Sequence, residues 1–116
     1  MKALVLKTNN TVEVEQDTEE FVSYATLSRA VGGLIEAVTL PNGLTLWVNE
    51  EGKNDGLPVN DYATRLFVSA FGAGIDIIVG DAIITGGYDD EGETLGLTDE
   101  QVKSLVEDTL FAGSPS

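Results

Sequence analysis

Residues 34–50 read LIEAVTLPNGLTLWVNE and carry the clearest structural signal in the chain. Two runs rich in β-branched and other apolar residues, 34–40 and 44–50, flank Pro41-Asn42-Gly43. Asn-Gly can adopt the positive φ angles that tight hairpin turns require. This stretch therefore predicts a β-hairpin, and the lone Trp47 in its second strand is expected to belong to the core.

Further strands are predicted on either side of this hairpin. Residues 3–6 and 11–15 indicate another hairpin, whose second strand alternates valines on one face with glutamates on the other. Residues 75–79 and 82–85 are β-branched runs joined at Gly80-Asp81. They are apolar enough that we expect both to be central strands of the sheet.

Three helices are predicted from capping residues and apolar spacing. The first is capped at Asp17, ends at Gly32-Gly33 and has the apolar stripe Phe21, Tyr24, Leu27 and Val31. The second is capped by Asn60 and has the stripe Ala63, Leu66, Phe67 and Ala70. The third follows a capping box at residues 98–101, and its inward residues are Val102, Leu105, Val106 and Thr109 or Leu110.

The resulting order, β-β-α-β-β-α-β-β-α, predicts an α+β fold with a mixed, mostly antiparallel sheet and helices packed against it. We expect a single domain over residues 1–112, an acidic loop over residues 86–96 and a frayed C-terminal tail over residues 113–116. Helices on one face would leave the other face and the edges of the sheet to be buried. A homodimer is therefore predicted.

Composition excludes many functions. The chain has 116 residues, no Cys and no His, which removes thiolate nucleophiles, Ser-His triads and zinc sites of the usual ligand type. Its formal charge of −14 repels nucleic-acid phosphates and anionic membranes, so direct binding to either is not expected. Apolar runs are too short to span a bilayer, and the run after Met1 ends too early for a signal peptide. We expect a cytoplasmic protein without a metal or cofactor.

Four segments resemble a known family: GGLIEAV at 32–38, LWVNEEGK at 46–53, GLPVN at 56–60 with Ala63-Thr64, and IVGD at 78–81. The family is a small domain of unknown function encoded widely in bacteriophages, especially those of actinobacteria. The resemblance covers roughly residues 24–85. It implies a phage accessory protein and transfers no catalytic residue.

A first candidate site binds a ligand through the polar loop after the second hairpin and through the two arginines of the chain. A loop between a strand and a helix is a common position for functional groups, and the arginine fork suits a phosphate or carboxylate. The alternatives are a solvated turn and ion pairs on helix surfaces. The candidate ligand-binding residues are Asn49, Glu50, Glu51, Lys53, Asn60, Arg29 and Arg65.

A second candidate site is the acidic loop, where Asp89, Asp90, Glu91 and Glu93 have no basic residue among them. These four carboxylates have no evident folding role in the sequence, so they are candidates for contact with a basic protein. The spacing partly matches a calcium loop, but Thr94 stands where that loop needs glycine, so no metal site is predicted.

Two functions of different classes follow, with an enzyme third. The first is a non-catalytic phage accessory protein that acts on the host, in counter-defence, by binding a host protein through an acidic surface. The alternative is a protein that sequesters a nucleotide-like small molecule, a phosphorylated signal, without cleaving it, using backbone amides with the arginines and Lys53. A carboxylate-only hydrolase with a divalent metal is the third, and no ligand cluster in the sequence identifies it.

Overall fold

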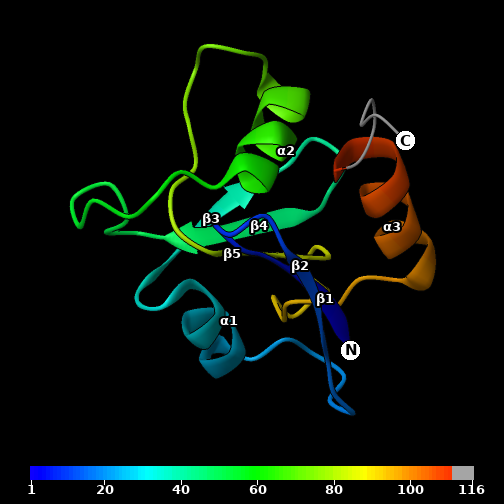
Figure 1. Ribbon diagram of the computed structural model, residues 1–116. Coiled ribbons are helices and arrows are strands. Elements are labelled where there is room, and N and C mark those ends of the chain that lie inside the picture. Colours follow the sequence, from blue (N-terminus) through cyan, green and yellow to red (C-terminus); the bar gives the residue numbers. More distant parts are fainter. Residues whose placement is uncertain (111–116) are drawn as a thin grey trace.

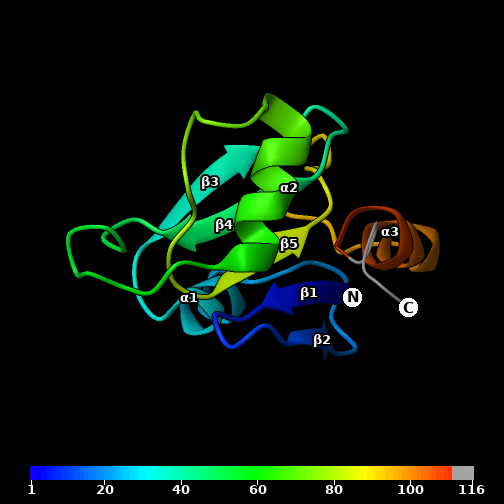
Figure 2. The same ribbon diagram turned by 45° about the horizontal axis from the view of Figure 1, so that its top comes forward.

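A five-stranded antiparallel sheet in the order β2-β1-β5-β4-β3 forms the centre of the molecule (Figures 1 and 2). The computed structural model describes residues 1–110. The predicted α+β class is confirmed, and the sheet, expected to be mostly antiparallel, has only antiparallel strand pairs in the described structure. The strands are β1 (Lys2–Leu6), β2 (Val12–Gln16), β3 (Ile35–Thr39), β4 (Thr45–Asn49) and β5 (Ala82–Thr85).

Helices cover both faces of the sheet. In Figure 1, α2 (Asp61–Phe71) lies over one face and α1 (Tyr24–Val31) over the other. The face under α2 is completed by α3 (Asp99–Ser104) and the π-helical segment η1 (Leu105–Leu110), since Leu105 is buried in the same core cluster as α2. We had expected helices on one face. This reason for expecting a homodimer is therefore wrong, while the oligomeric state itself stays a prediction.

Strand alternation divides the core into two clusters. Leu46 and Ile84 point towards α2, whereas Trp47 and Ile83 point towards α1. Trp47 is only 8% exposed, as predicted for a core tryptophan. Its indole Nε1–H donates to the Thr85 hydroxyl at 2.9 Å, so the polar atom of the ring is paired inside the core.

The hairpin at residues 34–50 is confirmed. Its two strands are β3 and β4, and Leu40 N–H donates to Leu44 O at 2.9 Å across the turn. Gly43 has a φ of 85°, which is the left-handed conformation that the Asn-Gly sequence predicted. The hairpin at the start of the chain is also present as β1 and β2, and its valines and glutamates lie on opposite faces, although Val14 is 54% exposed.

Residues 75–79 do not form the predicted strand. Only an isolated bridge, between Val59 and Val79, is present there, and Ile75 is 62% exposed. The reason is topological. β5 pairs with β1 on one side and with β4 on the other, so neither of its edges is open to the segment that precedes it.

The first helix starts later than predicted. Its N-cap is Ser23, whose hydroxyl accepts from Thr26 N–H, while the Asp17 carboxylate accepts from Glu19 N–H in a local turn. Phe21 is not helical and forms a bridge with Leu95. The predicted stripe therefore holds for the buried Leu27 and Val31 and fails for the residues before them.

The third helix begins as predicted. Thr98 and Gln101 form a reciprocal capping box, with Gln101 N–H donating to Thr98 Oγ1 at 3.1 Å and Thr98 N–H donating to Gln101 Oε1 at 2.8 Å. The side chains of Thr109 and Leu110, the domain end at residue 112 and the predicted tail lie outside what the structure describes. Among the described residues, no helix has the length and apolar character needed to cross a membrane.

Candidate functional site

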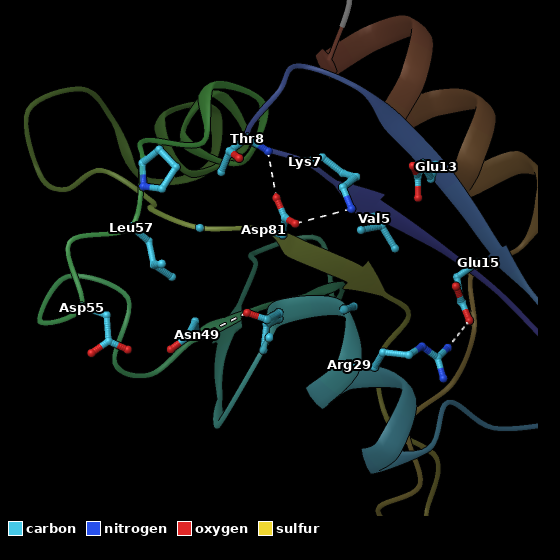
Figure 3. A pocket seen from close by; sticks show the side chains of 15 residues that line it. Val5, Lys7, Thr8, Glu13, Glu15, Arg29, Asn49, Asp55, Leu57 and Asp81 are labelled. Atoms are coloured by element: carbon cyan, nitrogen blue, oxygen red, sulfur yellow. Dashed lines mark hydrogen bonds and ion pairs between the residues drawn. The ribbon is translucent and has the colours of Figure 1, made fainter.

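A cavity of about 440 Å³ lies on the α1 side of the sheet, and we call it the α1 cavity (Figure 3). The first hairpin, the C-terminal end of α1 and the loop at 55–58 enclose it, with Val5 of β1 among its lining residues. Glu13 and Glu15 reach it because strand alternation puts both on the α1 side of β2. Fold elements far apart in the sequence thus build one polar surface.

Each basic side chain that lines the α1 cavity forms an ion pair with a carboxylate of the protein. Lys7 lies 3.5 Å from Asp81, which also accepts from Thr8 N–H at 2.9 Å. Arg29 donates to Glu15 at 2.6 Å, an ion pair between α1 and β2 (Figure 3). The two basic side chains that line the cavity are therefore already engaged by the fold.

The lining of the α1 cavity has an excess of negative charge. Glu13 and Asp55 add two carboxylates that make no hydrogen bond or ion pair with the described residues. The C-terminal end of α1 also lines the cavity, and the carbonyls of a helix C-terminus carry partial negative charge. Four carboxylates thus face two basic side chains, an arrangement that favours cationic ligands over anionic ones.

A second cavity, of about 310 Å³, lies on the other side of the sheet beside β3, and we call it the β3 cavity. Val38, Phe67 and Ile77 supply apolar lining from the edge strand, from α2 and from the loop after α2. The charged groups in its lining are three carboxylates, Glu36, Glu50 and Asp76, and one basic residue, Lys53. This cavity is therefore partly apolar and again acid-rich.

An ion pair between Lys53 and Asp76 joins the two loops that border the β3 cavity. The hydrogen bond from Lys53 lowers the pKa of the Asp76 carboxyl, and the Ile77 N–H, which donates to the same carboxylate at 2.8 Å, lowers this pKa further. Asp99 also has a lowered pKa because Lys2 donates to it at 2.7 Å. These carboxylates stay ionised at neutral pH.

The predicted ligand-binding residues separate into three places. Arg29 lines the α1 cavity, Glu50 and Lys53 line the β3 cavity, and Asn49 lines both. Asn49 is also structural, because its Nδ2–H donates to Val31 O at 3.1 Å and its Oδ1 accepts from Glu51 N–H at 2.8 Å. Three of the loop residues thus share the β3 cavity, but the full predicted set, with Arg29, is not assembled around one ligand.

The other three predicted ligand-binding residues line neither cavity. Asn60 is fully buried: it caps α2 and donates to Leu6 O and Gly80 O, which occupies its whole amide. Arg65 lies on α2 with its guanidinium 5.8 Å from the centre of the Tyr62 ring. Glu51 is exposed and accepts from the Asn54 amide at 3.2 Å. We leave Asn60 out of the candidate site because it has no free polar atom.

The acidic loop has more structure than its sequence predicted. Tyr88 and Thr94 form a bridge, and the Asp89 carboxylate accepts from Glu91 N–H and Glu93 N–H, both at 2.9 Å. Asp89 therefore has a folding role, contrary to expectation. Asp90, Glu91 and Glu93 are exposed and make no side-chain hydrogen bond with the described residues.

Sequence reasoning missed several residues of the two cavities. These are Lys7, Glu13, Glu15 and Asp81 in the α1 cavity and Glu36 and Asp76 in the β3 cavity. The alternation of β2 indicated that its glutamates share a face, but nothing in the sequence placed that face beside α1. Within residues 1–110, no group of three or more acidic residues has the geometry to hold a metal ion.

The fold and its cavities define a small α+β domain with a helix-covered antiparallel sheet and acid-rich surface cavities. The chain belongs to the family described as "Domain of unknown function (DUF3846)", which matches residues 1–110. The expected membership of a domain-of-unknown-function family is thus confirmed, over a longer range than the quoted motifs. Neither the curated proteins nor the solved structures contain a match to the chain.

Proposed function

We propose that this chain is a non-catalytic binding protein that contacts a basic partner protein through its acidic surface. The observation that carries the proposal is the distribution of ion pairs. Lys2, Lys7, Arg29 and Lys53 are each paired with one carboxylate of the fold. The chain has 20 acidic and 6 basic residues, so most of its carboxylates have no basic side chain to neutralise them.

An uncompensated acidic surface acts on partners before contact. Its field raises the rate at which a basic surface arrives, and added salt weakens this effect. The exposed carboxylates of the acidic loop, Asp90, Glu91 and Glu93, project from a turn that Asp89 holds in place. A fixed cluster loses little entropy on binding, which favours this loop as a contact surface.

The alternative, sequestration of a nucleotide-like phosphorylated ligand, has less support. Arg29 would have to leave Glu15 to hold a phosphate, and the α1 cavity contains four carboxylates that would repel it. Lys53 is likewise engaged by Asp76, in a cavity with two further carboxylates. Electrostatics thus favours a cationic partner at both cavities.

The biological setting is part of the proposal and is supported by the sequence resemblance. We propose a bacteriophage accessory protein that acts in the cytoplasm of the infected host and binds a host protein in counter-defence. The charge of −14 supports a protein partner over direct binding to nucleic acid.

The test replaces the exposed acidic-loop residues together, as Asp90→Asn, Glu91→Gln and Glu93→Gln, and retains Asp89 for its folding role. The matched control changes the charge equally at exposed residues elsewhere, as Glu19→Gln, Glu20→Gln and Glu107→Gln. We expect the loop variant to lose capture of a basic protein from host lysate at low salt, with a melting temperature no lower than that of the wild-type protein. The control should retain capture.

Two results would overturn this proposal. If wild-type protein captures no basic protein at low salt, or if the loop variant captures as well as the control, the acidic loop is not the contact surface. A thermal-shift screen with cyclic and adenine nucleotides then tests the alternatives. A shift with recovery of intact nucleotide supports sequestration, whereas loss of the nucleotide shows an enzyme.

A further inference from the structure

The outer edge of β3 has backbone groups that the fold leaves free. Leu40 N–H donates to Leu44 O, and Glu50 N–H donates to Leu34 O, both at 2.9 Å. These two bonds show which residues of β3 are hydrogen-bonded to β4. In an antiparallel pair such residues alternate, so the even-numbered residues of β3 bond to β4 and the odd-numbered ones do not. Ile35, Ala37 and Thr39 therefore turn their N–H and C=O groups outwards, where no hydrogen bond from residues 1–110 reaches them.

This edge lacks the features that usually prevent strand addition. Protected edges carry prolines, bulges, several charges or a covering segment. The β3 sequence, Ile35-Glu36-Ala37-Val38-Thr39, contains one charged residue and no proline, and its five pairs with β4 run without a bulge. A strand could extend the sheet here without breaking any hydrogen bond of the described fold.

Apolar surface adjoins the free edge on the α2 side. Val38 of β3 lines the β3 cavity together with Phe67 and Ile77, and Ile77 is 47% exposed. Leu34, at the start of the strand, and Ile75, in the loop after α2, are exposed as well. Apolar side chains of an added strand would be buried here, which supplies binding energy beyond the backbone hydrogen bonds.

Carboxylates adjoin the same edge on the α2 side of the sheet. Glu36 and Glu50 line the β3 cavity and have no basic partner among the described residues. On the α1 side, Trp47 is the cross-strand partner of Ala37, and the Tyr88 ring at the start of the acidic loop stands edge-on to it, 6.4 Å between centroids. An added strand therefore meets two carboxylates without a basic partner on the α2 side, while the aromatic pair lies on the α1 side.

We propose that β3 binds an extended segment of a partner protein by β-strand addition, and that this segment carries lysine or arginine side chains among apolar ones. The positive charge of the partner follows from the proposed function, on which this part of the proposal rests. The mode of binding follows from the free edge of β3. A second copy of the chain fits less well, because it would bring a charge of −14 against −14.

The opposite edge of the sheet provides a matched control. Lys7 N–H donates to Thr11 O, and Asp17 N–H donates to Met1 O, so Val14 on β2 turns its N–H outwards as Ala37 does on β3. Proline at either position removes an outward N–H and no hydrogen bond of the sheet. The Ala37→Pro and Val14→Pro variants thus differ in which edge they block.

The probe is a synthetic peptide of alternating lysine and valine, compared with the same peptide N-methylated at every residue. N-methylation removes the N–H donors along both edges of the peptide and preserves charge and side chains. We expect Ala37→Pro to weaken binding of the unmodified peptide at least about tenfold, and Val14→Pro to change it less than about twofold. The methylated peptide should bind wild-type protein no better than the unmodified peptide binds Ala37→Pro.

Amide hydrogen exchange on the wild-type protein tests the same idea without a variant, so the test survives if Ala37→Pro fails to fold. The amides of Ile35, Ala37 and Thr39 should exchange fast in the free protein and slowly with the unmodified peptide. Binding of the methylated peptide with equal affinity, or protection at β2 instead, would overturn strand addition at β3.

Two outcomes separate this inference from the proposed function. If Ala37→Pro folds and still captures the basic host protein, strand addition is wrong while the proposed function stands. If wild-type protein captures no basic protein, the proposed function falls whatever the peptide does. Sedimentation that shows wild-type dimers and monomeric Ala37→Pro would make a second copy the occupant and overturn the choice of a basic partner.

Discussion

Asn60 joins three parts of the fold through one buried side chain. Its Oδ1 accepts from Ala63 N–H at the start of α2, and its Nδ2 donates to Leu6 O at 2.7 Å and Gly80 O at 2.9 Å. The sequence predicted the cap correctly, because asparagine before a helical apolar pattern is a common N-cap. The same residue looked available to a ligand because its burial depends on β1 and on the turn before β5.

Replacing Asn60 should destabilise the protein strongly. Asn60→Ala removes the cap and the two hydrogen bonds that its buried amide donates to Leu6 O and Gly80 O, so we expect a loss of about 2–4 kcal/mol in the free energy of unfolding. Urea unfolding measures it. Ser23→Ala, which removes the exposed cap of α1, is the control and should cost about 1 kcal/mol. Equal losses in the two variants would show that water replaces the buried amide.

At the scale of elements, the Lys53–Asp76 pair connects the loop after β4 with the loop after α2. The pKa of Asp76 is lowered in the folded protein by the hydrogen bond from Lys53. Its contribution to stability is therefore present above the unfolded pKa, about 3.9, and is lost as pH falls through the lower folded-state pKa.

The pH dependence of stability should show this pair. We expect the melting temperature of wild-type protein to exceed that of Asp76→Asn at pH 7, and the difference to shrink as the pH falls below about 4. Asp90→Asn, at an exposed carboxylate without a basic partner in the described structure, is the control and should show no such loss. A difference for Asp76→Asn that stays constant over this range would contradict the role of the ion pair.

The sequence correctly predicted those features that depend only on neighbouring residues, such as turns and helix caps. The turn at Asn42-Gly43 and the capping box at residues 98–101 are both present where the sequence placed them. Residues 75–79 have equally strong β-propensity but do not pair with β5, because β1 and β4 already occupy both of its sides. Propensity describes a residue's preference, whereas strand formation also needs a free neighbouring edge.

The candidate site was predictable in part, for a related reason. For Arg29 the sequence left ligand binding and a helix-surface ion pair as alternatives, and the structure shows an ion pair whose partner is Glu15 on β2 rather than a neighbour on its own helix. The cavities depend on which sheet face meets which helix, and the order of the strands decides that. Single residues of the site could be named from the sequence, while their grouping into two cavities could not.

At the scale of the whole molecule, the formal charge of −14 opposes compaction of the chain. Salt screens this repulsion over a Debye length that falls from tens of ångströms at very low salt to about 8 Å at physiological salt. The side-chain ion pairs of Lys2, Lys7, Arg29 and Lys53 are exposed or half-buried, and screening weakens them as well. We expect the repulsion among 20 carboxylates to outweigh such pairs.

The melting temperature should therefore rise with salt. Between about 20 mM and 300 mM sodium chloride we expect an increase of about 5 °C. Chloride is preferred to sulfate because sulfate also strengthens apolar burial. Differential scanning calorimetry measures the change, and the acidic-loop variant, with three fewer charges, is expected to show a smaller increase. A fall in melting temperature with salt would mean that the ion pairs outweigh the repulsion.

The central position of β5 affects how the chain folds during synthesis. The two hairpins, β1–β2 and β3–β4, are local and can form within microseconds, yet an isolated hairpin is at best marginally stable. β5 pairs with both and joins them into one sheet, and its residues are translated about 35 positions after the end of β4. At 5–20 residues per second, this gap lasts about 2–7 s. For that time the nascent chain presents two unsupported hairpins with apolar faces, which is the stage at which chaperones and proteases would encounter it.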